Sequence, residues 1–308
     1  MAMAAKPEPR YMGGQAVLEG VMMRGAQTWA VAVRDPEGEI KVDVRRVPGW
    51  AERYRNIPIV RGVTSLAESL GLGYRALTWS ANQQVPEEEQ VSETAMGWAV
   101  GVAVVVFSAL FIVIPVLAGN SLRHLFHGSF PVVEGLVRLA LFVAYLLLIG
   151  NLRDIKRVFQ YHGAAHKAIA AYENDVELTP DTAQQFSTAH VRCGTNFLLT
   201  VMVIAIIVYS VIPRPNLFFV IGSRLVLVPV IAGLSYEVIR LAAKNIHRGW
   251  VRALMRPGLW LQKLTTRQPD LDQLEVAIAS LRAVMSAEQL AEVDARAGQR
   301  VPRIAPAV

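Results

Sequence analysis

The chain has 308 residues, of which 53% are hydrophobic and 18% are charged, with a mean hydropathy of +0.34 and a formal net charge of +6. This composition is too apolar for an ordinary soluble protein, in which about a quarter of the residues are charged. The single cysteine excludes an intrachain disulfide, so nothing in the sequence points to an oxidising compartment.

Residues 11–95 are predicted to form a small cytosolic α+β domain after a disordered tail at residues 1–10. Apolar and polar residues alternate on both sides of Asp35-Pro36-Glu37-Gly38. This pattern predicts a β-hairpin, because Pro fixes φ and Gly tolerates a positive φ at a turn. The glycine-punctuated run at 13–25 is interpreted either as turns or as a close backbone approach. Residues 58–81 predict a helix that is too charged to span a bilayer but suits the membrane surface.

Four hydrophobic segments follow, and they predict four transmembrane helices at residues 96–118, 132–150, 197–212 and 217–236. The first contains no charged residue and is long enough to cross about 30 Å of hydrocarbon. The last two are separated only by a short proline-containing turn, which predicts a helical hairpin. The predicted fold class is therefore a mainly α membrane protein with a small β-hairpin-containing cytosolic domain.

Lysine and arginine are distributed unevenly around these segments. Eleven lie in residues 1–95, five in 151–196 and eleven after residue 236, against one each in 119–131 and 213–216. Because cytoplasmic flanks of membrane proteins are enriched in Lys and Arg, both termini and the 151–196 loop are expected in the cytoplasm. This arrangement explains the positive net charge without a nucleic-acid partner. The expected main partner is therefore the lipid bilayer.

The 151–196 loop contains the residues with the most distinctive chemistry. His162 and His166 are four residues apart, so on one helix both imidazoles lie on the same face. His190 and Cys193 form an H-x-x-C pair, and imidazole and thiolate ligands suit Zn²⁺. The helix of the second span is expected to continue through this region to about residue 173.

A second short helix is expected to begin at Thr179-Pro180 and to end near His190, which would bring the two pairs together as a His₃Cys site. A closed set of four ligands would be structural, whereas an open position would be needed for catalysis. A hydrogen-bonded cluster without metal is the remaining alternative, with Cys193 as a small buried apolar residue.

Three residues are candidates for a catalytic role: Glu173, Glu237 and Lys167. Glu173 lies near the face of His162 but about 10.5 Å beyond His166 along an unbroken helix. It is therefore expected to orient another ligand or to act on a substrate, and not to bind the same ion. Glu237 follows the last predicted span, where it either faces the histidines or forms a salt bridge.

Charged residues also lie within the predicted spans. Arg224 is near the middle of the fourth span, where a charge is costly and is usually paired or functional. Glu134 and Arg138 are four residues apart near the start of the second span. They can pair with each other, and the simpler interpretation is that both side chains extend to the membrane surface.

The C-terminal part, residues 237–296, is predicted to form cytosolic and interfacial helices before a disordered tail at 297–308. Its first half combines apolar and basic residues, as expected of a helix on an anionic leaflet. Residues 271–285 predict an amphipathic helix whose apolar face packs on the cytosolic domain or on a partner. The residues of that face are Leu274, Ala277, Ile278 and Leu281.

The central loop resembles the signature of the YqhQ-like family of bacterial membrane proteins. The matching residues are Tyr161, His162, Gly163, Ala164, His166, Lys167, Tyr172, Glu173, His190, Arg192, Cys193, Gly194, Thr195 and Phe197. Residues 13–25, 61–77, 234–240 and 262–278 are similar to further stretches of the family. The resemblance implies a protein of the bacterial cytoplasmic membrane, in a family of unknown function that carries the label of metal-dependent enzymes.

This chain departs from the family at one position, because the family usually has Glu where Ala165 stands here. With Glu, the run would form H-x-x-E-H, a zinc-peptidase pattern in which Glu is the general base. Alanine cannot accept a proton. Three functions follow as expectations: a scaffold or regulator with a partner membrane protein or as an oligomer, a membrane-anchored metal-dependent hydrolase, or a transporter, for which Arg224 is the only support.

Overall fold

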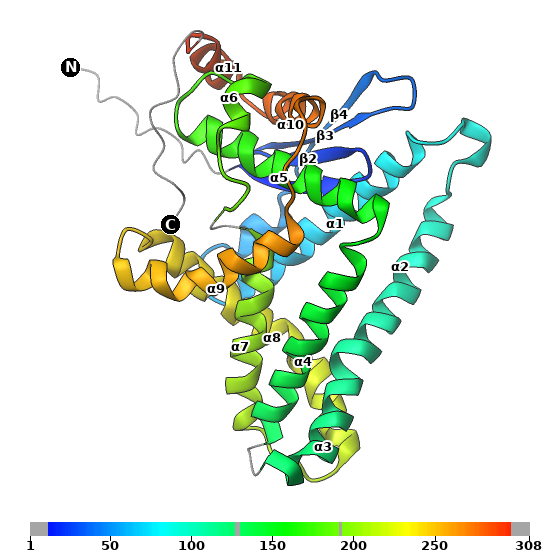
Figure 1. The fold of residues 1–308 in the computed structure, drawn as a ribbon, viewed down its shortest axis with the longest axis vertical. Coiled ribbons are helices and arrows are strands. Elements are labelled where there is room, and N and C mark those ends of the chain that lie inside the picture. Colours follow the sequence, from blue (N-terminus) through cyan, green and yellow to red (C-terminus); the bar gives the residue numbers. More distant parts are fainter. Residues whose placement is uncertain (1–11, 127–129, 191–192, 297–308) are drawn as a thin grey trace.

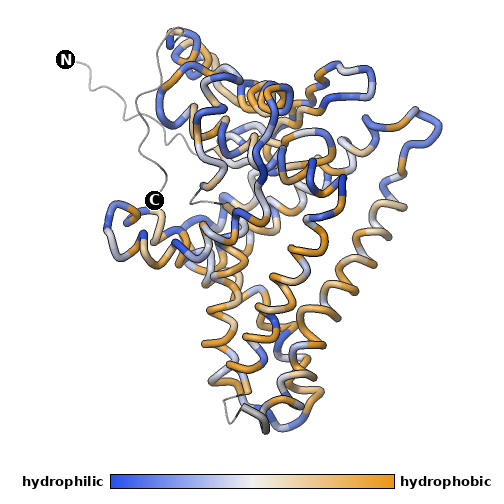
Figure 2. Tube along the Cα trace, in the orientation of Figure 1, coloured by the Kyte–Doolittle hydropathy of each residue, from blue (hydrophilic) through white to orange (hydrophobic). Residues whose placement is uncertain are grey.

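A computed structural model describes residues 12–126, 130–190 and 193–296. Both predicted disordered tails, together with Arg192, lie outside these described residues. The molecule consists of a sheet domain at one end and a bundle of long helices at the other (Figure 1). Apolar residues are concentrated along the bundle, whereas the sheet domain is mixed in character (Figure 2).

The N-terminal region forms a four-stranded antiparallel sheet in the order β1-β2-β3-β4. Its strands are β1 (Gly13–Val17), β2 (Gly20–Arg24), β3 (Thr28–Arg34) and β4 (Ile40–Arg46). The predicted hairpin around Asp35 is confirmed as β3 and β4. Of the two interpretations of residues 13–25, the close backbone approach is confirmed at Gly20, but the run as a whole is a second hairpin and not a series of turns. Gly20 is needed there, since a Cβ would lie 2.2 Å from the Ala32 carbonyl oxygen.

Helix α1 (Val60–Asn82) lies between the sheet and the bundle (Figure 1). It follows the 3₁₀ turn η1 (Trp50–Tyr54) and precedes the short turn η2 (Glu87–Glu89). Leu72 and Ala76 are buried against the sheet residues Val17 and Trp29. A Cβ at Gly62 would lie 2.7 Å from the Tyr236 side chain, so α1 also packs closely on the bundle. The helix therefore contacts protein on two sides.

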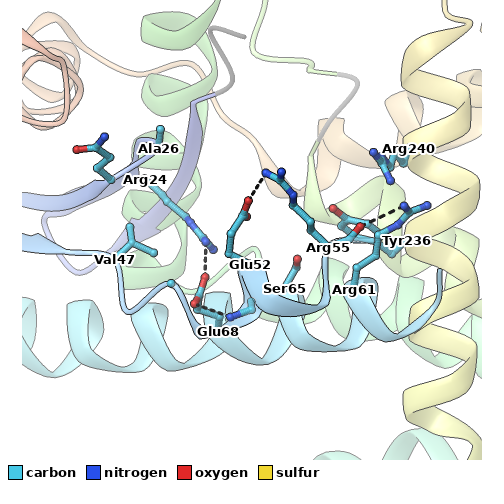
Figure 3. A pocket seen from close by; sticks show the side chains of 13 residues that line it. Arg24, Ala26, Val47, Glu52, Arg55, Arg61, Ser65, Glu68, Tyr236 and Arg240 are labelled. Carbon is cyan, nitrogen blue, oxygen red and sulfur yellow. Dashed lines mark hydrogen bonds and ion pairs between the residues drawn. The ribbon is translucent and has the colours of Figure 1, made fainter. Parts of the chain in front are cut away.

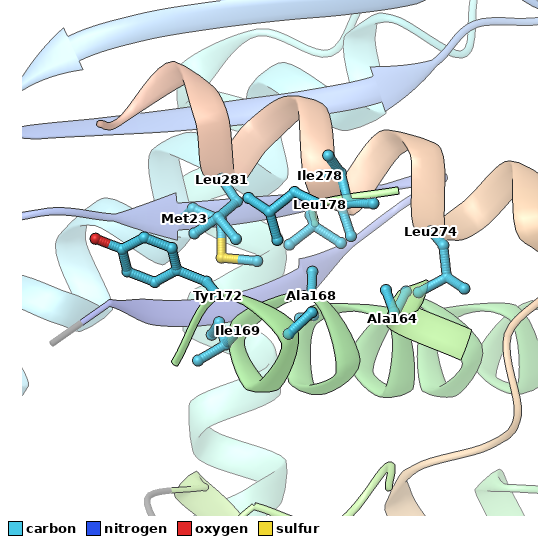
Figure 4. Close-up of a cluster of buried hydrophobic side chains, with 14 of the residues drawn as sticks. Met23, Ala164, Ala168, Ile169, Tyr172, Leu178, Leu274, Ile278 and Leu281 are labelled. Atoms are coloured by element: carbon cyan, nitrogen blue, oxygen red, sulfur yellow. The ribbon is translucent and has the colours of Figure 1, made fainter. Parts of the chain in front are cut away.

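The main core lies between the sheet, α5 (Arg153–Glu173) and α10 (Leu271–Ala283). Figure 4 shows apolar side chains from the three elements pointing toward one another. The predicted apolar face of α10 is confirmed, since Leu274, Ala277 and Leu281 are fully buried and Ile278 is 6% exposed. Two short helices, α6 (Pro180–Gln184) and α11 (Ala287–Asp294), complete this domain.

Among the described residues, three helices are long and apolar enough to cross a membrane, at Glu93–Leu122, Phe130–Ile149 and Leu217–Lys244. The first combines α2 (Glu93–Ser108), a π-helical turn η3 (Ala109–Val113) and α3 (Ile114–Phe126). The others are α4 and α8, and α8 continues eight residues past the predicted end at residue 236. The predicted third span is α7 (Gly194–Ser210), an apolar helix of 17 residues that packs beside α8.

The prediction that the second span continues unbroken into the histidine region is wrong. Helix α4 ends at Ile149, and α5 begins at Arg153 after Leu152, whose φ of −67° and ψ of 138° are extended. The Gly150 carbonyl accepts a bond from Arg267 at 3.1 Å, and Arg157 pairs with Glu19 of the sheet domain. These contacts direct α5 across the sheet.

The short helix α6 ends at Gln184, so the expected helix up to His190 is also wrong. After residue 184 the chain leads to Cys193, the N-cap of α7. Helix α9 (Gly249–Thr265) crosses the top of the bundle and buries Val251 and Leu261. Its Trp250 and Trp260 are more than 60% exposed, consistent with the predicted interfacial helix.

Candidate metal centre

Helix α5 places His162 and His166 on one face, as their spacing predicts. Their ring centroids are 4.5 Å apart in an edge-to-face arrangement. Cys193 comes from the other side of the break between α6 and α7, where its sulfur accepts a hydrogen bond from the Thr195 backbone N–H at the start of α7. The centre therefore joins the helix that packs on the sheet with the first residue of a bundle helix.

The ligand atoms of His162, His166 and Cys193 all lie within 4.8 Å of one another. The Cys193 Sγ atom is 3.3 Å from His162 Nε2. His166 and Cys193 are each 5% exposed, so the cluster is shielded from solvent. Of the four predicted metal ligands, the structure brings these three together.

Both imidazoles are held by backbone carbonyls on the side away from the sulfur. His162 Nδ1 lies 2.9 Å from the Thr265 oxygen, and His166 Nδ1 lies 2.5 Å from the Thr188 oxygen. A carbonyl only accepts, so each Nδ1 carries the hydrogen and donates it. In the neutral ring this leaves the Nε2 lone pair available, which is the arrangement of most metal-bound histidines.

The cluster also changes the acidity of its members. Burial raises the pKa of the Cys193 thiol, but hydrogen bonds from His162 and His166 outweigh burial and lower that pKa to about 4. Burial lowers the pKa of His162, yet its bond to Cys193 outweighs this and raises the pKa overall. Burial lowers the pKa of His166. The contact between the Cys193 sulfur and His162 therefore favours the thiolate and the charged form of His162 together.

His190 lies beside this group and is tied to other residues. Its Nε2 atom is 3.3 Å from a carboxylate oxygen of Glu173, and its ring centroid is 5.6 Å from that of His166. The Gln262 side chain bonds to both the backbone N–H and the carbonyl of His190, each at 2.9 Å. Glu173 thus contacts His190, the fourth predicted ligand, and is not one of the three converging ligands.

The other two catalytic candidates lie elsewhere. The Lys167 amine is buried and donates to the carbonyls of Gln184 and Phe186, each at 2.6 Å, and burial lowers its pKa. These bonds hold the chain after α6 in place. Of the two alternatives for Glu237, the salt bridge is the one found, because its carboxylate binds the Arg61 guanidinium and the Ile59 backbone N–H and does not face the histidines.

Ala165 points away from the centre. It is fully buried, and its methyl group would lie 3.2 Å from a Cβ built on Gly14 in β1. Position 165 therefore faces the sheet core, about 100° around the helix from His166. A carboxylate at this position would enter the apolar core, so the H-x-x-E-H pattern does not describe the geometry here.

The charged residues predicted within the spans meet in one buried cluster. Glu134 accepts hydrogen bonds from Arg138 at 2.5 Å and from Arg224 at 2.7 Å, and both Glu134 and Arg224 are at most 1% exposed. Arg138 also donates to the Phe111 carbonyl in the π-helical turn, at 2.8 Å. The interpretation that Glu134 and Arg138 extend to the membrane surface is wrong, because both side chains point into the bundle.

Several partners in the centre carry no sequence signal. Thr188, Gln262 and Thr265 act through backbone atoms or an amide. Gln262 lies 72 residues after His190, and Thr265 lies 103 residues after His162. Only the similarity of residues 262–278 to the family marks that stretch as notable. The contacts of Gln262 and Thr265 with the histidines depend on how α9 packs, which the sequence pattern does not specify.

Three candidate membrane-spanning helices among the described residues, beside a sheet domain and a buried His/Cys cluster, have the features of a membrane protein. A family model described as "Protein of unknown function (DUF1385)" matches residues 57–287. The chain is also 33% identical, over 316 residues, to the "Uncharacterized protein YqhQ" of Bacillus subtilis (strain 168), covering 96% of this chain and 98% of that protein. The chain belongs to this YqhQ-like family. No solved structure matches it.

Proposed function

We propose that the chain is a scaffold or regulator of the bacterial cytoplasmic membrane, and that its His/Cys cluster binds one Zn²⁺ that fastens the sheet domain to the membrane helices. The observation that supports this most is the convergence of His162, His166 and Cys193, with both imidazoles oriented by backbone carbonyls. A fixed imidazole with its Nε2 free is pre-arranged as a ligand.

The donor set and its spacing suit zinc. In a tetrahedral site, a ligand nitrogen and a ligand sulfur lie roughly 3.5–3.6 Å apart, given Zn–N near 2.0–2.1 Å and Zn–S near 2.3 Å. The separation of 3.3 Å between His162 Nε2 and Cys193 Sγ is slightly shorter, so a small movement of either side chain would admit the ion. Metal ligation also needs a thiolate and neutral histidines, and the lowered pKa of Cys193 favours the thiolate.

The position of the cluster favours a joining role. Helix α5 packs on the sheet and α10, whereas α7 packs on α4, α8 and α9. His162 and His166 belong to the first group, Cys193 begins the second, and Thr265 ends α9. A metal held here would connect α5 directly with the start of α7, so its loss would loosen the sheet domain from the bundle.

The membrane arrangement in this proposal has four spans, with α7 as the third. Seventeen residues extend roughly 25 Å at 1.5 Å per residue, slightly less than a hydrocarbon core of about 30 Å. Its place within the apolar bundle beside α8 supports the assignment (Figure 1). The Lys and Arg distribution then places the sheet domain and both termini in the cytoplasm.

A membrane-anchored hydrolase is the second candidate, and one observation favours it. Three ligands leave a fourth position on a tetrahedral ion, and the His190–Glu173 pair lies beside His166. A zinc ion with an open position lowers the pKa of a bound water. In this case the Glu173 carboxylate would hold the hydrogen on His190 Nε2, which makes Nδ1 the proton-accepting nitrogen of the ring. His190 would then serve as the general base, a role that alanine at position 165 cannot fill.

Hydrogen exchange on the full chain in detergent tests the joining role. We expect peptides covering residues 153–173, 185–190 and 262–267 to exchange faster after chelation and to recover with Zn²⁺, while β3 and β4 stay unchanged. A His166→Asn variant should lose the zinc response, and His247→Asn, an exposed histidine outside the cluster, should keep it. Equal exchange in the chelated and zinc-loaded parent would contradict the proposal.

The same preparation separates the two candidates. A hydrolase should turn over a model ester or peptide when zinc-loaded, and Glu173→Gln should abolish turnover while zinc content stays the same. A scaffold should show no turnover in either protein, and its exchange pattern should still depend on zinc.

A further inference from the structure

A polar pocket of about 360 Å³ lies where the sheet domain meets the end of α8. Its walls come from the end of the sheet, η1, the first half of α1, and Tyr236 and Arg240 of α8. Figure 3 shows Arg24 and Glu68 at one end and Arg61, Tyr236 and Arg240 at the other, with Glu52 and Arg55 between them. Two stretches noted in the sequence, 61–77 and 234–240, therefore meet in one pocket.

The acidic groups around the pocket are already bound. Glu68 is 3% exposed, binds the Arg24 guanidinium and accepts from the Ala51 backbone N–H at 3.4 Å. Glu237, which lies next to the lining residue Tyr236, binds Arg61. These two pairs form the rigid frame of the pocket.

Two further arginines supply cationic groups that can turn toward a ligand. Arg55 pairs with Glu52 at 2.5 Å, but both side chains are about two-thirds exposed, and such surface pairs contribute little stability. Arg240 is exposed and has no acidic partner within hydrogen-bonding distance in the part of the chain that the structure describes. With Glu237 included, four arginines face three glutamates around the pocket, which leaves it with one excess positive charge.

We propose that this pocket binds a phosphoryl group, with Arg55 and Arg240 as its cationic contacts. Guanidinium groups bind phosphate oxygens through paired, charge-assisted hydrogen bonds, which favours phosphate over a neutral ligand. The hydroxyl-bearing side chains of Ser65 and Tyr236 also line the pocket and can donate to further oxygens.

Two sources can present this chemistry. Arg240 lies one turn before the end of the candidate span Leu217–Lys244, close to where the headgroups of a bilayer would lie. An anionic phospholipid can therefore reach the pocket from the membrane, and a soluble phosphate ester can reach it from the aqueous side. The pocket shares no residue with the His/Cys cluster, so phosphoryl binding here does not depend on whether the cluster binds zinc.

The test uses the full chain purified in phospholipid-free detergent. One arm measures binding of inorganic phosphate by calorimetry. The other counts bound phosphatidylglycerol against phosphatidylcholine by native mass spectrometry. The test variant is Arg55→Gln/Arg240→Gln. Its matched control is Arg53→Gln/Lys244→Gln, which removes the same charge from exposed neighbours on η1 and α8 that do not line the pocket.

We expect the parent to bind the phosphoryl probe and the test variant to bind it about tenfold more weakly or less, since two charge-assisted contacts are lost. The control should stay within about twofold, because exposed charges outside the pocket act only through screened, long-range attraction. Binding of free phosphate identifies a soluble ligand, and selective binding of phosphatidylglycerol alone identifies a headgroup. The proposal is overturned if neither binds, if phosphatidylcholine binds equally, or if both double variants weaken binding to the same extent.

Discussion

At the scale of single residues, the chemistry of the cluster depends on which atoms carry protons. Both Nδ1 atoms donate to carbonyls, so the two Nε2 atoms and the Cys193 sulfur share the remaining protons. The pairing of thiolate with imidazolium stabilises charge in a buried place, where neither group would ionise alone. The same pairing prepares the sulfur to bind a metal.

The lowered pKa of Cys193 can be tested in the metal-free protein. A lowered pKa means that Cys193 is deprotonated above about pH 4 and becomes a thiol only below it. The ultraviolet absorbance of the thiolate, taken as the difference between the parent and Cys193→Ser, should therefore persist through pH 7 and 6 and disappear near pH 4. A midpoint near the value of a free thiol, about 8.5, would show that the pair with His162 does not form.

Sequence patterns identified these residues and the shared face of His162 and His166, but not how the four predicted ligands are arranged in space. The i, i+4 spacing of His162 and His166 predicts a shared face, because α-helical geometry is local. The separation of His190 from the other three, and the burial of Ala165 against Gly14, depend on the packing of α5 on a sheet hairpin that the sequence did not predict. Local sequence patterns do not predict contacts between segments that are far apart in the chain.

At the scale of elements, the spans are held together by a charge cluster. Arg138 on α4 and Arg224 on α8 share one carboxylate, Glu134, and Arg138 also reaches the π-helical turn before α3. The i, i+4 pair could be anticipated from sequence, but Arg224 is 90 residues from Glu134. Three helices thus meet at one acidic side chain, which makes Glu134 the key residue of the bundle.

A Glu134→Gln substitution should destabilise the bundle strongly, because it leaves two buried guanidinium groups without a counter-charge. Breaking a buried ion pair in this way costs about 3–5 kcal/mol. Thermal unfolding of the purified protein in detergent measures the effect. Glu93→Gln, an exposed change at the start of α2, serves as control and should leave the midpoint nearly unchanged. Parental stability in Glu134→Gln would mean that the cluster contributes little.

At the scale of the whole molecule, two regions connect the sheet domain to the bundle. One is the contact of α1 with α8 around Gly62 and Tyr236, and the other is the His/Cys cluster. Amphipathic and apolar periodicity predicted α10 and the long spans well, since burial in a core or in lipid leaves a direct pattern in the sequence. The break between α4 and α5 was missed because it is caused by contacts with Arg267 and Glu19, far along the chain.

The four-span arrangement predicts which residues face the outside of the cell. A single cysteine at position 214, between α7 and α8, should react with a membrane-impermeant maleimide in intact cells when placed in a Cys193→Ser background. Cysteines at positions 88 and 288 should react only after lysis, because the sheet domain and C-terminal helices are cytoplasmic in the proposed topology. Labelling of 88 in intact cells would reverse the orientation. Absence of labelling at 214 would mean that α7 does not cross the membrane.

The most direct test of the central claim is the metal content of the full chain, purified in detergent without chelator, beside a His162→Ala/Cys193→Ala variant. Elemental analysis should find about one zinc per chain in the parent and none in the variant, because two of the three converging ligands are then missing. No metal in the parent, or equal metal in both proteins, would contradict the account and leave the cluster as a hydrogen-bonded part of the fold.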